Sequence, residues 1–341
     1  METPTVAVLP KVSELIKTSW TSYKKNWKNF LVLGAIPFSI TVLGTIFTLI
    51  NTFGHAPSFI KGIILVITFL LSIAGTVVSI VFPLVLIKYI KDGEENVPFD
   101  SKRIYKDMLG LFFPLLWIGI LFGLICMGGS IFLIIPGIAL SGYLGYYQYV
   151  LVTDDTRGLK ALISSFYYVR GNWWGVFGRI LALGLIMAVI VLPVVAIIGV
   201  LFVLMNGGFS VENLQTLFGT TQVSASTYLF QTLFNLVSNA IGLAVVYPIF
   251  TFYSYFIFKG LKATKILPDE QGQKKARGWF IGLSIFGAVV IPLLFISMIV
   301  LLSFDARRKS SESAMYQQQA MERLNEAQNV YSEPSTSTPA I

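Results

Sequence analysis

The sequence predicts an all-α protein that crosses a lipid bilayer about seven times. Of its 341 residues, 55% are hydrophobic and only 12% are charged, whereas roughly a quarter of the residues in soluble domains are charged. A helix needs about 20 apolar residues to cross ~30 Å of hydrocarbon. Apolar runs of about this length or more lie at 29–50, 63–87, 109–129, 131–152, 174–205, 227–258 and 279–303. They predict a polytopic α-helical membrane protein with about seven transmembrane helices.

The apolar runs divide the chain into five parts. Residues 1–28 are expected to form a cytoplasmic arm with an amphipathic helix, and residues 29–258 a membrane core of six helices. Residues 259–278 form a basic cytoplasmic loop that leads into the seventh transmembrane helix, 279–303. Residues 304–341 form a polar, partly disordered tail, because their composition lacks the apolar residues that a packed core needs.

The basic residues predict how the chain is oriented in a plasma membrane, which we expect to be bacterial. Before the seventh run, every Lys and Arg except Lys61 lies in one of four alternate segments, 1–28, 88–108, 153–179 and 259–278. Loops rich in Lys and Arg stay on the cytoplasmic side of the membrane. We therefore expect the N-terminus and these four segments to face the cytoplasm.

The seventh run carries basic residues at both ends. Lys274, Lys275 and Arg277 precede it, and Arg307 and the two basic residues after it follow. The two ends of this run therefore carry equal numbers of basic residues, so the charges do not predict its orientation. The side of the tail follows instead from the alternation of the preceding spans. We expect the C-terminus to be extracytoplasmic.

Two basic segments share one pattern of residues, which indicates an internal repeat. The segment from Ser19 to Trp27 precedes the first span, and the segment from Ser165 to Trp173 precedes the fifth. Both contain a serine, aromatic residues, a basic residue and Asn-Trp at the same spacing. Because each copy contains an even number of spans, the two copies should run parallel to each other.

These two segments, within 11–28 and 158–173, also predict basic amphipathic helices at the membrane interface. Their apolar residues recur at steps of three and four, and basic residues lie between them. Each basic residue close to anionic lipid contributes about 1 kcal/mol of binding energy. One interpretation is that they sense or handle lipid headgroups, and the plainer interpretation, which we favour, is ordinary anchoring. The expected interface anchors are Trp20, Trp27, Lys24, Lys25, Phe166, Arg170, Trp173 and Trp174.

Several motifs in the middle of the chain resemble those of one bacterial family. The most specific are Ile134-Ile135-Pro136-Gly137-Ile138 and Val169-Arg170-Gly171-Asn172-Trp173, which a serine at position 165 precedes. Together they resemble the membrane domain found with glycerophosphoryl diester phosphodiesterases and in stand-alone relatives of that domain. The resemblance covers roughly 15–260 and implies a core of six spans. It implies no activity, because the phosphodiesterase reaction belongs to a separate soluble barrel that has no counterpart in this sequence.

The residues that carry enzyme and metal chemistry are scarce. Cys126 is the only cysteine and His55 the only histidine, so we expect no zinc or other imidazole-rich metal site and no cofactor. No charged residue lies deep within a span, and the nearest, Arg179, lies close enough to the cytoplasmic end of its span to reach the interface. These features argue against an enzyme, an ion pump and a proton-coupled transporter. Nothing indicates a nucleic-acid partner.

The sixth run carries the clearest polar stripe. Gln231, Asn235 and Asn239 lie four residues apart and therefore on one face of a helix. Such side chains form hydrogen bonds between membrane helices, each worth ~0.6–2 kcal/mol. They indicate either such contacts, the interpretation we favour, or a polar cavity or groove for a headgroup. In the third run, Gly119 and Gly123, with Gly128 and Gly129 at the end of the run, predict close helix packing.

These observations lead to two functional hypotheses. The first is a non-enzymatic scaffold or accessory factor that organises lipid, or a protein partner that the sequence does not identify. It depends on the basic amphipathic segments and on the absence of catalytic residues. The second is a transporter or lipid-handling protein that uses the polar groove of the sixth span. In both cases we expect membrane lipids, in particular anionic headgroups at the cytoplasmic face, as partners.

Overall fold

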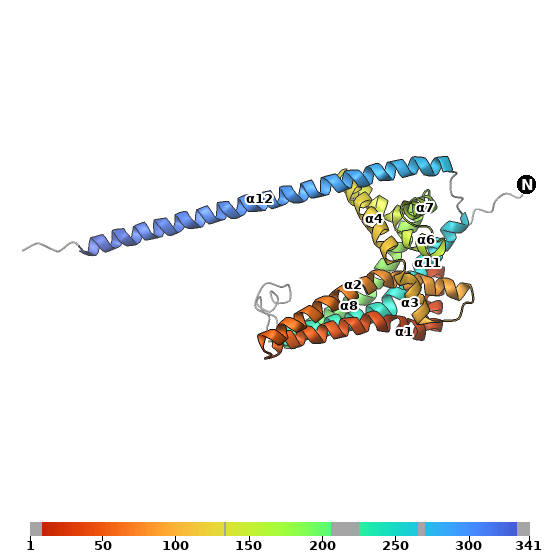
Figure 1. Ribbon diagram of the computed structural model, residues 1–341, viewed down its shortest axis with the longest axis horizontal. Helices are drawn as coiled ribbons and strands as arrows, with labels where there is room; N and C mark the ends of the chain where they lie inside the picture. The colour runs from red at the N-terminus through yellow and green to blue at the C-terminus, as the bar shows by residue number, and fades with distance from the viewer. Residues whose placement is uncertain (1–8, 133, 206–224, 265–269, 333–341) are drawn as a thin grey trace, which may run out of the picture.

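The computed structural model describes residues 9–132, 134–205, 225–264 and 270–332. Within these ranges every element is a helix and there is no strand, so the prediction of an all-α protein is confirmed there. Figure 1 shows two groups of helices that diverge from a common junction. The helices, in chain order, are α1 (Val12–Phe53), α2 (Ser58–Glu94), α3 (Ser101–Leu109), α4 (Phe112–Phe132), α5 (Ile134–Leu144), α6 (Tyr147–Thr153), α7 (Leu159–Val169), α8 (Trp173–Met205), α10 (Ala225–Ile241), the π-helix η1 (Gly242–Val246), α11 (Tyr247–Thr264) and α12 (Glu270–Ser332).

Six helical stretches in the described ranges are long and apolar enough to cross a membrane, which supports a polytopic helical membrane protein. They are Val12–Phe53, Ser58–Glu94, Phe112–Ser130, Trp173–Val200, Tyr228–Thr264 and Gly272–Ser313. The stretches correspond to six of the seven predicted spans. The exception is the fourth apolar run, 131–152.

The fourth run is not one continuous helix. It folds as α5 and α6, which are 11 and 7 residues long and are separated by a turn at Gly145 and Tyr146. The Nζ of Lys91 donates to the carbonyls of Val152 and Thr153, both at 3.3 Å. The end of α6 therefore lies beside the C-terminal end of α2. Residues 131–152 thus lead back to the basic end of the helices, although no single helix of membrane length lies within them.

The two expected interfacial helices have different structures. Residues 12–28 continue into the first span as part of the 42-residue α1, whereas α7 is a separate helix of 11 residues. The repeat pattern aligns Gly171, which follows α7 and has a φ of 86°, with Lys25 inside α1. A positive φ is accessible to glycine and unfavourable for lysine, which accounts for the difference. α7 is also buried on most of its sides, so it packs against protein where we expected an interfacial position.

The helices form two groups that meet at a buried junction (Figure 1). In one group α1 packs against α2, α10 and α11. In the other, α4 packs against α5 and α12. Fully buried side chains are found on α2, α6, α7 and α11, which pack against one another at the junction; they include Leu84, Ile87, Val150, Leu162, Tyr253 and Phe258.

The close crossing of α4 and α12 depends on Gly128, which the sequence pattern indicated, and on Gly287, which it did not. A Cβ atom on Gly128 would lie 2.9 Å from the carbonyl oxygen of Leu283, and one on Gly287 would collide with the carbonyl oxygen of Leu124. The two backbones are therefore in contact. The prediction that Gly119 and Gly123 mediate close packing is wrong, because a Cβ atom on either would meet no atom within 4 Å.

The C-terminal part is more helical than expected. α11 extends to Thr264 and α12 begins at Glu270, so helix occupies most of the predicted loop 259–278. α12 then continues to Ser332 without a break, which makes the first part of the predicted polar tail an extension of the last span. Residues 333–341, where we expected disorder, lie outside the described ranges.

Candidate functional site

A polar cavity of about 850 Å³ lies between α1, α2 and α10, within segments that the hydropathy assigns to the membrane. We call it the hydroxyl groove, because hydroxyl groups from all three helices dominate its polar lining. Its polar residues are Thr41, Thr45, Thr48, Thr68, Ser72, Thr76, Ser79, Tyr228, Thr232, Asn235 and Asn239.

Each of the three helices contributes one stripe of residues to the groove. Thr41, Thr45 and Thr48 follow one another at steps of four and three on α1, so their side chains share a face of the helix. Small residues, such as Gly44 on α1 and Gly75 on α2, widen the space between the stripes. The threonine stripes were visible in the sequence, but only the stripe in the sixth span was recognised as a candidate site.

Five of the six threonine hydroxyls in the lining, all except that of Thr232, donate a hydrogen bond to their own helix. Each one donates to the carbonyl oxygen four residues earlier on its own helix, at distances from 2.8 to 3.0 Å: Thr41 to Pro37, Thr45 to Thr41, Thr48 to Gly44, Thr68 to Ile64 and Thr76 to Ser72. A hydroxyl that donates in this way keeps its lone pairs as acceptors. These threonines therefore present acceptor oxygens to the groove.

The structure brings two of the three predicted stripe residues into the groove. Asn235 and Asn239 line it and are exposed, whereas Gln231 is half-buried and does not contribute to the lining. Within the part of the chain that the structure covers, neither asparagine side chain forms a hydrogen bond. Their amide groups are therefore free to bind a ligand in the groove.

A second cavity, of about 420 Å³, lies between α2, α4 and α6. Ser79 and Ile80 line both this cavity and the hydroxyl groove, so α2 separates the two spaces at these residues. The polar groups of the second cavity include Gln148, whose amide donates to the Tyr147 hydroxyl at 3.3 Å. Gly119 also lines it, in agreement with the open space around that residue.

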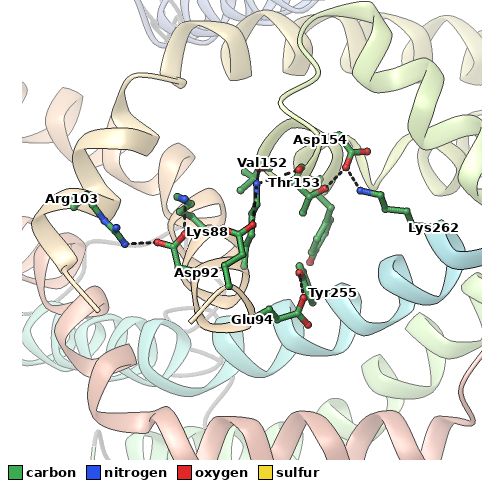
Figure 2. A network of polar contacts seen from close by, with 12 residues as sticks. Lys88, Asp92, Glu94, Arg103, Val152, Thr153, Asp154, Tyr255 and Lys262 are labelled. Carbon is green, nitrogen blue, oxygen red and sulfur yellow. Dashed lines mark hydrogen bonds and ion pairs between the residues drawn. The ribbon is translucent and has the colours of Figure 1, made fainter. Parts of the chain in front are cut away.

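A network of charged residues lies at the basic end of the helices (Figure 2). Asp92 on α2 accepts from Lys88 at 2.6 Å and from Arg103 on α3 at 2.7 Å, and its side chain is only 3% exposed. A buried carboxylate is costly to desolvate unless it is paired. The two cations therefore pair with the buried carboxylate of Asp92 and connect α2 to α3.

The network extends to α6, α7 and α11. Glu94 accepts from Lys259 at 2.7 Å and from the Tyr255 hydroxyl at 2.9 Å. Asp154 is paired with Lys262 and accepts from the Tyr168 hydroxyl at 3.2 Å. Burial, reinforced by the negative charge of Asp154, raises the pKa of Tyr168 to about 12. Apart from Lys88 and Asp92, which are four residues apart, the distant partners, such as Lys259 for Glu94 and Lys262 for Asp154, could not be predicted from the sequence.

The predicted interface anchors divide into two groups, and the outward-facing group includes Trp20, Trp27 and Trp174. These tryptophans are 44%, 46% and 77% exposed, respectively. Lys25 is also exposed, and the Nζ of Lys24 lies 5.1 Å from the centre of the Trp20 ring. These five side chains are placed as interfacial residues would be.

Two of the remaining three anchors, Phe166 and Trp173, pack against protein. The ring of Phe166 lies 5.1 Å from that of Tyr143, and the indole of Trp173 donates to the carbonyl of Ala139 at 3.1 Å. These two residues lie at the junction, where α7 packs against α5. Their contacts indicate a role in packing the helices together and not in anchoring the protein to lipid. Arg170 is exposed, with its guanidinium 5.9 Å from the centre of the Tyr167 ring.

Arg179 is held by the chain itself. Its guanidinium donates to the carbonyls of Leu9 and Pro10, at 2.9 and 2.8 Å, and to that of Gly175 at 2.8 Å. In the described segments, no group of three or more His, Cys, Asp or Glu residues is arranged to hold a metal ion.

Comparison of the chain with known protein families, with curated proteins and with solved structures finds no match.

Proposed function

We propose that this protein is a multi-pass membrane protein that binds the polar part of an amphipathic molecule in the hydroxyl groove. The observation that carries the proposal is a polar cavity of about 850 Å³ inside segments that are apolar enough to lie in lipid. Pockets that enclose small molecules typically measure ~300–1,000 Å³. Lipid tails would leave the groove's amide and hydroxyl groups unsatisfied, whereas a polar headgroup would satisfy them.

The second cavity supports movement of the bound group along α2. The hydroxyl groove is lined by residues 40–48 of α1, which lie toward the end of that span remote from its basic arm. The second cavity is lined by Leu115 and Leu116, near the opposite end of the membrane. Since Ser79 and Ile80 line both, the two spaces adjoin along α2, and a bound group could pass from one to the other around this helix. The protein would then be a lipid-handling protein or transporter.

The proposed location is the plasma membrane of a bacterium, with the N-terminus in the cytoplasm and the C-terminus outside. The clustering of Lys88, Lys91, Arg103, Lys259 and Lys262 at one end of the helices supports this orientation. Anionic headgroups on the cytoplasmic side are the proposed partners of the exposed basic residues. The chain would use no cofactor and catalyse no reaction.

A scaffold remains the second candidate function, and one observation favours it. Beyond its crossing with α4 at Gly287, α12 exposes apolar side chains on all sides, among them Leu293, Leu294, Phe295 and Ile296. Such a helix could hold a membrane partner that is yet to be identified. The resemblance to the membrane domain of glycerophosphoryl diester phosphodiesterases is compatible with either function and stays a proposal.

Photolabelling of the full chain in bilayer nanodiscs tests the groove. The nanodiscs should contain a lipid with a photoactivatable group next to its headgroup, and the labelled peptides should be identified by mass spectrometry. We expect labels to concentrate on residues 40–48, 68–80 and 228–239. The variant Thr45→Trp should remove most of this labelling by filling the groove.

The matched control is Thr52→Trp. Thr52 lies on the same helix and makes the same kind of bond, to the carbonyl of Thr48 at 2.9 Å, but it lies outside the groove. Labelling that falls equally on groove and lipid-facing peptides would refute the proposal, as would identical labelling in the two variants. A scaffold would instead be supported by a stoichiometric partner that dissociates when residues 293–296 are changed to alanine.

A further inference from the structure

We infer that the hydroxyl groove selects an uncharged, hydroxyl-rich group, such as a sugar or another polyol, over a phosphate. The inference rests on the proposed function and names the class of ligand. It follows from which hydrogen-bonding groups the groove offers and from which charges it lacks.

The groove offers many acceptors. Five threonine hydroxyls donate their proton to a carbonyl of their own helix, so toward the groove they can only accept hydrogen bonds; these are Thr41, Thr45, Thr48, Thr68 and Thr76. A ligand that matches five such oxygens must donate hydrogen bonds. Sugars and other polyols carry several hydroxyl donors, whereas a phosphate diester carries none.

Charge argues against an anionic ligand. Among the described residues that line the hydroxyl groove or the second cavity there is no Lys, Arg, His, Asp or Glu. A phosphate that left water for this site would lose its hydration without meeting a cation. It would also face the lone pairs of the threonine oxygens. An uncharged head avoids both costs.

The two asparagines provide complementary donors, beside the remaining hydroxyls of the lining, those of Ser72, Ser79, Tyr228 and Thr232. Asn235 and Asn239 lie one turn apart on α10, and their side chains have no hydrogen-bond partner among the described residues. Each amide carries two N–H donors and one acceptor, so the pair can bind the oxygens of neighbouring hydroxyl groups. Tyr228 lies one turn from Thr232 on the same helix, and its ring is positioned by an edge contact with Phe53 at 5.6 Å.

The same chemistry can come from a neutral glycolipid or from a free polyol. A competition experiment on the full chain in phosphatidylcholine nanodiscs distinguishes them. The probes are a monoglucosyl diacylglycerol, a phosphatidic acid with the same acyl chains, and methyl glucoside. Binding is measured by displacement of the groove photolabel.

We expect the glucosyl lipid to displace the label and the phosphatidic acid to do so at least about tenfold more weakly. The triple variant Thr41→Val, Thr45→Val and Thr76→Val should weaken glucosyl-lipid binding by a similar factor, because valine keeps the shape and removes the acceptors. Thr52→Val is the matched control and should bind as the unmodified protein does. The helices should tolerate these changes, since the hydroxyls bond only to their own backbone.

Each outcome bears on a different claim. Displacement by methyl glucoside at the affinity of the glucosyl lipid would support the inference, with a free polyol as its source. Equal or tighter binding of phosphatidic acid, still abolished by Thr45→Trp, would overturn the inference and leave the proposed function intact. Displacement that is insensitive to Thr45→Trp for every probe would overturn both.

Discussion

The hydroxyl of Ser165 in α7 accepts a hydrogen bond from the backbone nitrogen of Tyr146, at 3.1 Å, where α5 ends and α6 begins. The same hydroxyl donates to the carbonyl of Tyr143 at 2.9 Å. One buried side chain thus satisfies a donor and an acceptor that the interrupted helix leaves free. Unpaired backbone groups are costly inside a membrane protein, so this contact allows the run 131–152 to fold as two helices.

Replacing Ser165 with alanine should therefore destabilise the protein by about 1–3 kcal/mol, because both backbone groups would lose their partner in a buried site. Ser19 is the matched control, since it occupies the equivalent position of the proposed repeat and is equally buried. Its hydroxyl bonds only to the carbonyl of Leu15, on its own helix, so Ser19→Ala should cost less than about 1 kcal/mol. Unfolding in mild detergent measures both changes. Equal losses would show that Ser165 has no special role at the break.

Replacing Asp92 with asparagine should destabilise the junction of α2 and α3 by about 2–4 kcal/mol, because Lys88 and Arg103 would keep their charges and lose the buried carboxylate between them. Asp155→Asn is the control. Asp155 is largely exposed and lies 3.5 Å from the exposed Arg157, so its loss should cost less than about 1 kcal/mol. The unfolding midpoint of each variant provides the comparison, and an unchanged midpoint for Asp92→Asn would contradict a stabilising role for the network.

Replacing Gly287 with valine should separate α12 from α4, because any side chain there collides with the backbone at Leu124. Gly282→Val is the control on the same helix, since a Cβ atom at Gly282 meets no atom within 4 Å. Spin labels on α4 and α12 would report the separation as a longer or broader distance distribution for Gly287→Val alone. The same distribution in both variants would argue against backbone contact at this crossing.

The stability of the protein should fall between about pH 10 and pH 12, in part because of Tyr168. The raised pKa of Tyr168, about 12 compared with a usual 10.0, means that the folded state favours the neutral phenol. This contribution is complete below pH ~10 and is lost as the pH rises through the folded-state pKa. The variant Tyr168→Phe should show a shallower decline of the unfolding midpoint over this window. Parallel curves for the two proteins would contradict the assigned cause.

Much of the architecture was predictable because lipid imposes it. Each spanning segment must satisfy its own backbone hydrogen bonds, and a long apolar run can do so only as a helix. Six of the seven predicted runs accordingly contain a membrane-length helix. The fourth run has the same composition, and its break depends on Ser165 and on the indole of Trp173, which donates to Ala139. Hydropathy contains no information about such distant partners.

The candidate site was predictable only in part. The stripe on α10 indicated a polar groove, and two of its three residues, Asn235 and Asn239, line one. The threonines opposite them carried no distinct signal, because a threonine that bonds to its own backbone is common in any membrane helix. The threonines become part of a candidate site only because three stripes, from distant parts of the chain, face the same cavity.

The sequence by itself determined that the protein is helical, that it lies in a membrane, and which ends of its helices are basic. These properties follow from local composition, since solvent and lipid act on each segment separately. The tertiary structure alone decided where the chain breaks, which charges pair, and which polar faces enclose a cavity. Lys259 and Glu94, for example, are separated by 165 residues and lie 2.7 Å apart. Contacts of this kind depend on how the helices pack, and packing is a property of the whole chain.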